Sequence, residues 1–135
     1  MSKLQIKKNN VRLELAKRGI LQRGGENKFD KYKYFSEAQY KELFTDLFSK
    51  CGIELTMTTR EVKTIDGTSS MPFGRQVVVE FTLKDVDTDD IEQSVIVGEA
   101  LDKGEKAIYK AYTGALKYFL ANVFMVATGD EPENS

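Results

Sequence analysis

The sequence contains no histidine, and Cys51 is its single cysteine. Without histidine, the chain can form no His-based catalytic triad, no imidazole acid or base and no histidine metal site. A lone cysteine excludes an internal disulfide and a zinc site built from several cysteines. The Gly-x-x-x-x-Gly-Lys-Ser/Thr motif of P-loop ATPases is also absent. We therefore expect no cofactor and no metal.

Long apolar runs are absent as well. No segment approaches the ~20 apolar residues of a membrane-spanning helix, and the first residues lack the apolar stretch of a signal peptide. The 135 residues, 41% of them hydrophobic with eight Phe and six Tyr, suffice for one domain with a packed core. These features indicate a cytoplasmic protein with no membrane partner.

The net charge is only −1, but the charged residues are unevenly distributed. Residues 1–33 contain ten basic and three acidic side chains, residues 34–102 contain six and fourteen, and residues 103–129 contain four and one. Two basic regions around an acidic middle could form one groove for a polyanion. We expect three parts: a basic N-terminal arm with a short helix at 1–25, a single α+β domain at 26–129, and a short acidic tail at 130–135.

The middle of the chain predicts a helix followed by three strands. Ser36 begins a capping box for a helix that runs through Lys50, and Gly52 is its expected stop. Segments 53–65, 76–83 and 94–97 are rich in β-branched residues in near alternation, which predicts a three-stranded antiparallel meander.

The connections in this region are acidic or long. The acidic run at 85–92 is interpreted as a hairpin turn rather than a calcium loop, because Asp90 stands where such a loop requires glycine. A long loop at 66–75 joins the first two strands, and Asp102 is expected to cap a long final helix. The resulting fold class is α+β, with a helix before the meander and a long helix after it.

The final helix carries a row of lysines. At helical pitch Lys103, Lys106, Lys110 and Lys117 fall on one stripe, and apolar side chains gather on the opposite side. Such a row suits a polyanion such as DNA. A solvated amphipathic helix, whose lysines only provide solubility, explains the pattern equally well.

Other residues near the row have open interpretations. Tyr109 and Tyr118 flank the lysines and either stack on bases or pack. Arg75, in the long hairpin loop, either extends over a bound strand or is an ordinary solvated arginine. Gly114 is unfavourable within a helix, so we expect a packed element or a phosphate to approach it closely.

A second segment interleaves cations with aromatic rings: Lys28, Lys31, Tyr32, Lys33 and Tyr34. Cations that contact phosphates and rings that stack on unpaired bases are typical of single-strand binding grooves. An edge strand that buries its rings on one face and solvates its lysines on the other is the alternative.

These motifs resemble a known family. Asn27-Lys-Phe-Asp-Lys-Tyr-Lys-Tyr34, Gly98-Glu-Ala-Leu-Asp-Lys103, Ala111-Tyr-Thr-Gly-Ala-Leu-Lys117-Tyr118 and the closing Thr128-Gly-Asp130 are similar to the pattern of the ERF-type single-strand annealing proteins of bacteriophages. That family is related to the Rad52-like recombination mediators. The resemblance implies a binding protein that is not an enzyme, a β-β-β-α core, and assembly into homo-oligomeric rings or helical filaments.

The function implied is binding of single-stranded DNA and ATP-independent annealing of complementary strands in phage-type homologous recombination, within a bacterial host cell and from a phage or prophage gene. A single-strand-binding protein is a further candidate partner. The alternatives are a protein-interaction module that regulates host recombination or single-strand-binding proteins, and a small nuclease. The predicted DNA-binding residues are Lys28, Lys31, Tyr32, Lys33, Tyr34, Arg75, Lys103, Lys106, Lys110 and Lys117.

Overall fold

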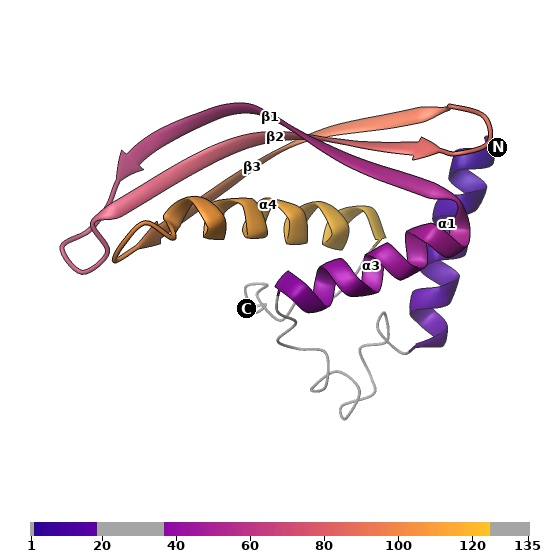
Figure 1. Cartoon of the computed structure of the whole chain (residues 1–135), viewed down its shortest axis with the longest axis horizontal. Helices are drawn as coiled ribbons and strands as arrows, with labels where there is room; N and C mark the ends of the chain where they lie inside the picture. The colour runs from indigo at the N-terminus through magenta and orange to yellow at the C-terminus, as the bar shows by residue number, and fades with distance from the viewer. Residues whose placement is uncertain (1, 19–36, 125–135) are drawn as a thin grey trace. The chain divides into compact units, whose positions relative to one another are not determined.

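The computed structural model describes residues 2–18 and 37–124 (Figure 1). Three strands form one sheet in the order β1-β2-β3, with helices before and after them. The predicted α+β class and the antiparallel meander are therefore confirmed. The elements are α1 (Lys3–Lys17), α3 (Glu37–Cys51), β1 (Ile53–Asp66), β2 (Phe73–Asp85), β3 (Ile91–Asp102) and α4 (Ala107–Phe124).

The chain divides into two compact units. The first contains Met1–Glu54, Lys84–Ile91 and Leu120–Ser135, and the second contains Leu55–Leu83 and Glu92–Phe119. Each unit is thus assembled from segments that are distant in the sequence. All three strands and helix α4 contribute residues to both.

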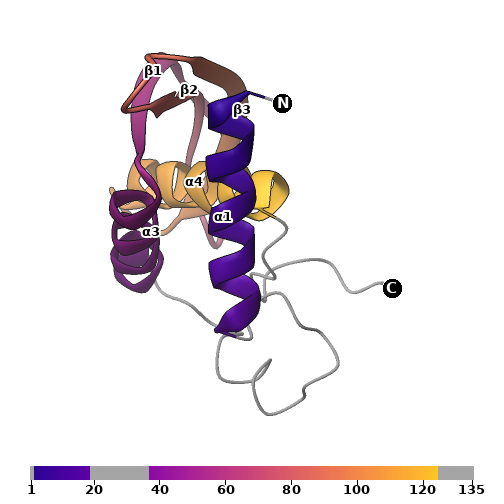
Figure 2. The same cartoon turned by 90° about the vertical axis from the view of Figure 1, so that its right-hand side faces the viewer.

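In the first unit, helices α1 and α3 pack against each other (Figure 2). The ring centroids of Phe44, Phe48 and Phe124 lie 5.5–5.7 Å apart in pairs, in tilted arrangements that suit aromatic quadrupoles. Helix α3 ends as predicted, because Gly52 has a φ of 76° and its amide donates to the carbonyl of Phe48.

Helix α1 spans 15 residues of the segment 1–25, where the sequence predicts a short helix. The Ser2 hydroxyl caps it by accepting from the amide of Gln5. Only Leu4, Val11 and Leu15 are fully buried, and these steps of seven and four place all three on one narrow side of the helix. Three buried apolar residues therefore suffice to seat a helix whose other residues are mostly polar or charged.

Lys7 of α1 is tied to the acidic turn between β2 and β3. Its Nζ lies 2.6 Å from Oδ1 of Asp85, 2.6 Å from Oδ2 of Asp87 and 3.3 Å from the carbonyl of Gly52. Buried Asp85 also accepts from the amide of Asp87 and the hydroxyl of Thr88. Chiefly because of Lys7, the pKa of Asp85 falls to about 2. The acidic run is the hairpin turn that the sequence predicts, with a structural role for its first carboxylate.

The second unit packs helix α4 on one face of the sheet. The rings of Phe81 and Phe119 stack at 4.4 Å, and Gly98 of β3 lies directly beneath the helix. A Cβ on Gly98 would lie 2.2 Å from the carbonyl oxygen of Ala111, so only glycine permits this approach. The expectation that a packed element approaches Gly114 is wrong, since a Cβ there would meet no described atom within 4 Å; the alternative of a phosphate stays a prediction.

Candidate nucleic-acid interface

Helix α4 begins later than the sequence predicts. The first helical residue is Ala107, and the amide of Lys110 donates to the carbonyl of Lys106, which therefore occupies the cap position. Lys103 lies in the connection between β3 and α4 and is not part of a helical stripe. Lys106, Lys110 and Lys117 do share one side of the helix, because their steps of four and seven keep them within a narrow arc.

Asp102 does not cap the helix, because it ends β3 instead. Its Oδ2 accepts from the amide of Gly104, and its Oδ1 lies 2.5 Å from Nζ of Lys110. The contact with Lys110 is the main reason that the pKa of Asp102 is lowered. One ammonium of the lysine row is therefore already neutralised in the protein alone, and a phosphate at Lys110 would compete with a fixed carboxylate.

Two tyrosines of α4 point outward on either side of the lysines. Tyr109 is 71% exposed and Tyr118 is 61% exposed, so neither is part of the core. Tyr112, by contrast, is half-buried, and its hydroxyl is 2.8 Å from that of Thr59 on β1. Both rings of Tyr109 and Tyr118 therefore lie outside the core, and their stacking on bases stays a prediction. We refer to Lys106, Tyr109, Lys110, Lys117 and Tyr118 together as the α4 surface.

The exposure and pairing of its cations differ. Lys106 and Lys110 are exposed, whereas Lys117 is half-buried. Within residues 2–18 and 37–124, Lys106 and Lys103 form no ion pair. Among the described residues, the α4 surface thus combines the Lys106 ammonium, which forms no ion pair, with the Lys110 ammonium, which is held by Asp102.

Arg75 lies on β2 and not in a loop, because the strand begins at Phe73. The hairpin connection is correspondingly shorter than predicted. The Arg75 side chain is half-buried, and its Nη1 donates to the carbonyl of Gly74 at 2.8 Å. This local contact holds the guanidinium against its own strand.

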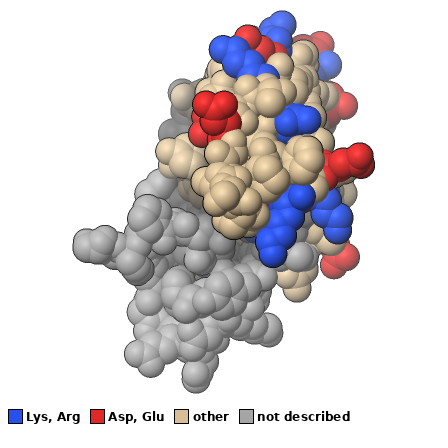
Figure 3. Space-filling model, turned by 90° about the vertical axis from the view of Figure 1, so that its left-hand side faces the viewer, with Lys and Arg blue, Asp and Glu red and all other residues tan. Residues whose placement is uncertain are grey.

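The remaining predicted residues, Lys28, Lys31, Tyr32, Lys33 and Tyr34, lie outside the described residues. Figure 3 shows one face of the molecule, on which basic and acidic side chains alternate around uncharged surface. Arg60 pairs with Glu80, and Lys63 lies 3.6 Å from Glu61. Basic charge on the strands is thus largely matched by acids, so the described part of the chain does not present one uniform cationic field.

Two further findings concern the kinds of site that the described residues form. Across 2–18 and 37–124, no three His, Cys, Asp or Glu side chains gather where they could hold a metal ion. None of the helices in the same ranges combines the length and the apolar character that crossing a membrane requires.

Comparisons with known proteins identify a family to which the chain is similar, but no individual protein that matches it. Neither the curated proteins nor the solved structures include one that matches the chain. The family model of the ERF superfamily matches residues 1–135. Because this match spans the whole sequence, the chain belongs to the ERF superfamily.

Proposed function

We propose that this protein binds single-stranded DNA and promotes the annealing of complementary strands without ATP. The observation that carries the proposal is the α4 surface, where the exposed rings of Tyr109 and Tyr118 lie on either side of Lys106 and Lys110. Rings that stack on bases beside cations that contact phosphates are the usual elements of sequence-tolerant single-strand binding. Membership of the ERF superfamily supports recombination by single-strand annealing.

The proposed mechanism changes no covalent bond, so the protein acts as a binding protein and not as an enzyme. Ammonium groups that meet phosphates release condensed counterions, and this release favours binding. A strand held along a basic surface keeps its bases available to a second strand and loses its own hairpins. Pairing and stacking then drive annealing, and the protein contributes by lowering the repulsion between the two backbones.

Annealing of long strands requires several binding surfaces in line, because one protomer contacts only a few nucleotides. We therefore propose homo-oligomers, as rings or helical filaments. In the described sheet, β1 and β3 are the outer strands, and each has one edge that pairs with no described strand. Such edges are candidate subunit contacts, as is the basic arm at 1–25. A single-strand-binding protein is a further proposed partner, and the proposed location is the cytoplasm of a bacterial host that carries the phage or prophage gene.

The proposal is tested by fluorescence anisotropy with a labelled oligonucleotide. Affinity should fall by roughly tenfold between 50 and 200 mM salt if two or three phosphates are contacted per protomer. Lys106→Ala combined with Lys110→Ala should weaken binding and reduce the salt slope. The matched control is Lys41→Ala with Lys63→Ala, which removes two exposed lysines elsewhere. An affinity that is independent of salt, or equal losses in both variants, would remove the α4 surface from DNA binding.

A further inference from the structure

We infer that a groove between α1 and α3 docks an acidic amphipathic helix of a partner protein. The groove is an open cavity of about 600 Å³, and all the residues that line it belong to the first unit. We name it the α1–α3 groove and define it by Lys3, Ile6, Asn10, Leu13, Lys17 and Lys50. The inference concerns a separate surface and does not rest on the function proposed above.

The wall formed by α1 has the spacing of a helix-docking face. Lys3, Ile6, Asn10, Leu13 and Lys17 follow one another in steps of three and four, as a and d positions do in a heptad pattern. The three buried residues of α1 lie on a different side, which packs into the core of the first unit. As far as residues 2–18 and 37–124 are concerned, the groove face of α1 is therefore available to a second helix.

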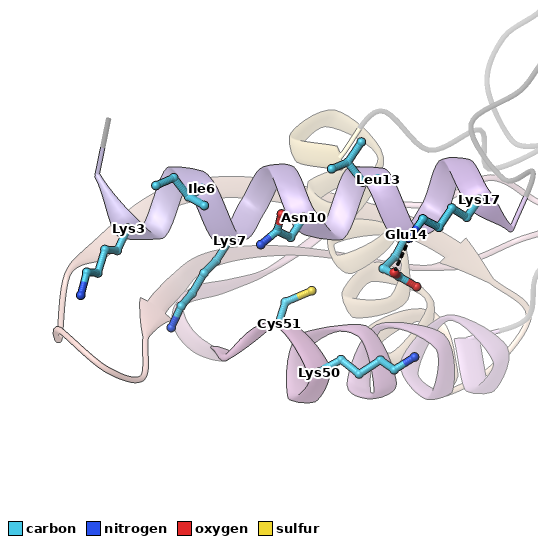
Figure 4. Close-up of a pocket in the computed structure, with 9 residues that line it drawn as sticks. All are labelled: Lys3, Ile6, Lys7, Asn10, Leu13, Glu14, Lys17, Lys50 and Cys51. Carbon is cyan, nitrogen blue, oxygen red and sulfur yellow. Dashed lines mark ion pairs between the residues drawn. The ribbon is translucent and has the colours of Figure 1, made fainter.

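Two apolar side chains on this face are exposed to solvent. Ile6 is 46% exposed and Leu13 is 52% exposed, seven residues apart on the same stripe. Figure 4 shows them along α1, with Lys50 and Cys51 on the neighbouring end of α3. Cys51 is half-buried, and desolvation is the main reason that the pKa of its thiol is raised. A partner helix would cover apolar surface at two heptad positions.

The charges of the groove select an acidic occupant. Lys3 and Lys17 stand at the two ends of the α1 face, and Lys50 lies on the opposite wall. Lys17 has one acidic neighbour, Glu14, at 3.5 Å. Within the described residues, Lys3 and Lys50 form no ion pair. Carboxylates on a docked helix would therefore find ammonium groups at both ends of the apolar contact.

Three other occupants fit less well. None of the described residues that line the groove is aromatic, so single-stranded DNA would find no ring on which to stack. A second copy of α1 would oppose Lys3 or Lys17 to another lysine in either orientation, and like charges disfavour such pairing. The acidic tail at 130–135 has no apolar side chain to cover Ile6 or Leu13 apart from its single proline.

The test uses the full-length protein and a fluorescein-labelled synthetic helix of about four turns, ~15 residues. This probe carries Leu at heptad positions and Glu on both flanks. A second probe replaces Glu by Gln, and a third replaces Leu by Ser. We expect the first probe to bind at least tenfold more tightly than either of the others, as measured by anisotropy.

Two groove variants and one matched control locate the binding. Lys3→Gln with Lys50→Gln removes charge, and Ile6→Ser with Leu13→Ser removes apolar surface. Each should weaken binding of the acidic probe at least tenfold. The control, Val62→Ser with Lys63→Gln on exposed positions of β1, should change it less than twofold. Thermal unfolding shows whether the serine variant folds, and the glutamine variant tests the inference if it does not.

The inference is overturned by any of four results. Binding of the Gln-substituted probe with equal affinity would remove the charge argument, and unchanged binding by the groove variants would place the probe elsewhere. An equal loss of oligonucleotide affinity in the groove variants would make the groove a DNA site. A change in the sedimentation coefficient of the variants alone would make it a contact between copies of the chain.

Discussion

The α4 surface and the α1–α3 groove both present lysines to solvent, but the neighbours of those lysines differ. On α4 the cations lie beside two exposed tyrosine rings, and one of the cations, Lys110, is held by Asp102. In the groove the cations lie at the ends of an aliphatic stripe formed by Ile6 and Leu13. The comparison teaches that the side chains around a cation, more than the number of cations, indicate which kind of anion it recognises.

The largest expected effect is a loss of DNA affinity when the exposed rings of the α4 surface are removed, whereas the α1–α3 groove has no ring among its described residues. Tyr109→Ala and Tyr118→Ala should each weaken single-stranded DNA binding by about 5- to 150-fold, since stacking on a ring contributes roughly 1–3 kcal/mol per base. Binding of the acidic helix should stay unchanged. Because both rings are exposed, thermal stability should change little. The phenylalanine variants keep the stacking face and should retain affinity, and if they lose as much as the alanine variants, the rings do not act by stacking.

A pair of glycine substitutions tests whether α4 must be seated closely on β3. Gly98→Ala should destabilise the protein by about 1–3 kcal/mol, because the new methyl group overlaps the carbonyl oxygen of Ala111. Gly114→Ala should stabilise it by about 0.5–1 kcal/mol, because the site is open and alanine favours the helix. Urea unfolding measures both.

The same pair sharpens the comparison between the two surfaces. Gly98→Ala displaces the helix that carries the α4 surface, so DNA affinity should fall while the groove keeps its affinity for the acidic probe. Stability changes of equal sign in the two variants would contradict the difference in packing described for Gly98 and Gly114.

A smaller effect on DNA affinity is expected from Asp102, whose carboxylate would compete with a phosphate for Lys110. Asp102→Asn should raise DNA affinity by about two- to fivefold, because Lys110 then meets phosphate without a carboxylate partner, and exposed pairs are worth up to ~1 kcal/mol. Glu105→Gln removes an equal charge nearby, from an exposed position. Anisotropy titrations of both variants distinguish the specific pair from a general change in charge, which would give the same gain in each.

The smallest effect concerns the anchor of α1, on which the groove depends. The pKa of Asp85 is about 2 in the folded protein against an ordinary 3.8. Since the folded pKa is the lower one, this carboxylate stabilises the fold above about pH 3.8, and the contribution is lost as the pH falls through about 2. Urea unfolding between pH 5 and pH 2 should show a shallower decline for Lys7→Met than for the wild type. Lys3→Met, on the same helix, should decline as the wild type does.

The elements were predictable where a repeated pattern and a glycine stop coincide. The helix that ends at Gly52 and the three strands follow from local sequence, because alternation and capping are short-range properties. The start of α4 was predicted too early, since Asp102 also fits a capping box. The interaction that decides its position, with Lys110 and the amide of Gly104, depends on the path of the chain after β3.

The candidate sites were less predictable, because exposure is a tertiary property. The lysine row of α4 was visible from the spacing, but nothing local shows that Tyr109 and Tyr118 point outward while Tyr112 is held by Thr59. Gly114 was singled out as a site of close approach because glycine is unfavourable within a helix, and no local signal pointed to Gly98. The helix–strand contact at Gly98 exists only in the folded sheet.

The anchor of α1 also has a consequence for the order of events during synthesis. Lys7 is among the first residues made, but Gly52 follows 45 positions later and Asp87 follows 80 positions later. Phe124, which completes the ring cluster with Phe44 and Phe48, comes later still. The α1 segment therefore leaves the ribosome before the residues that anchor Lys7 have been made, and contacts between such distant residues form slowly. An isolated helix of 15 residues is only marginally stable in water, so premature termination before the acidic turn should leave the α1 segment undocked and accessible to proteases.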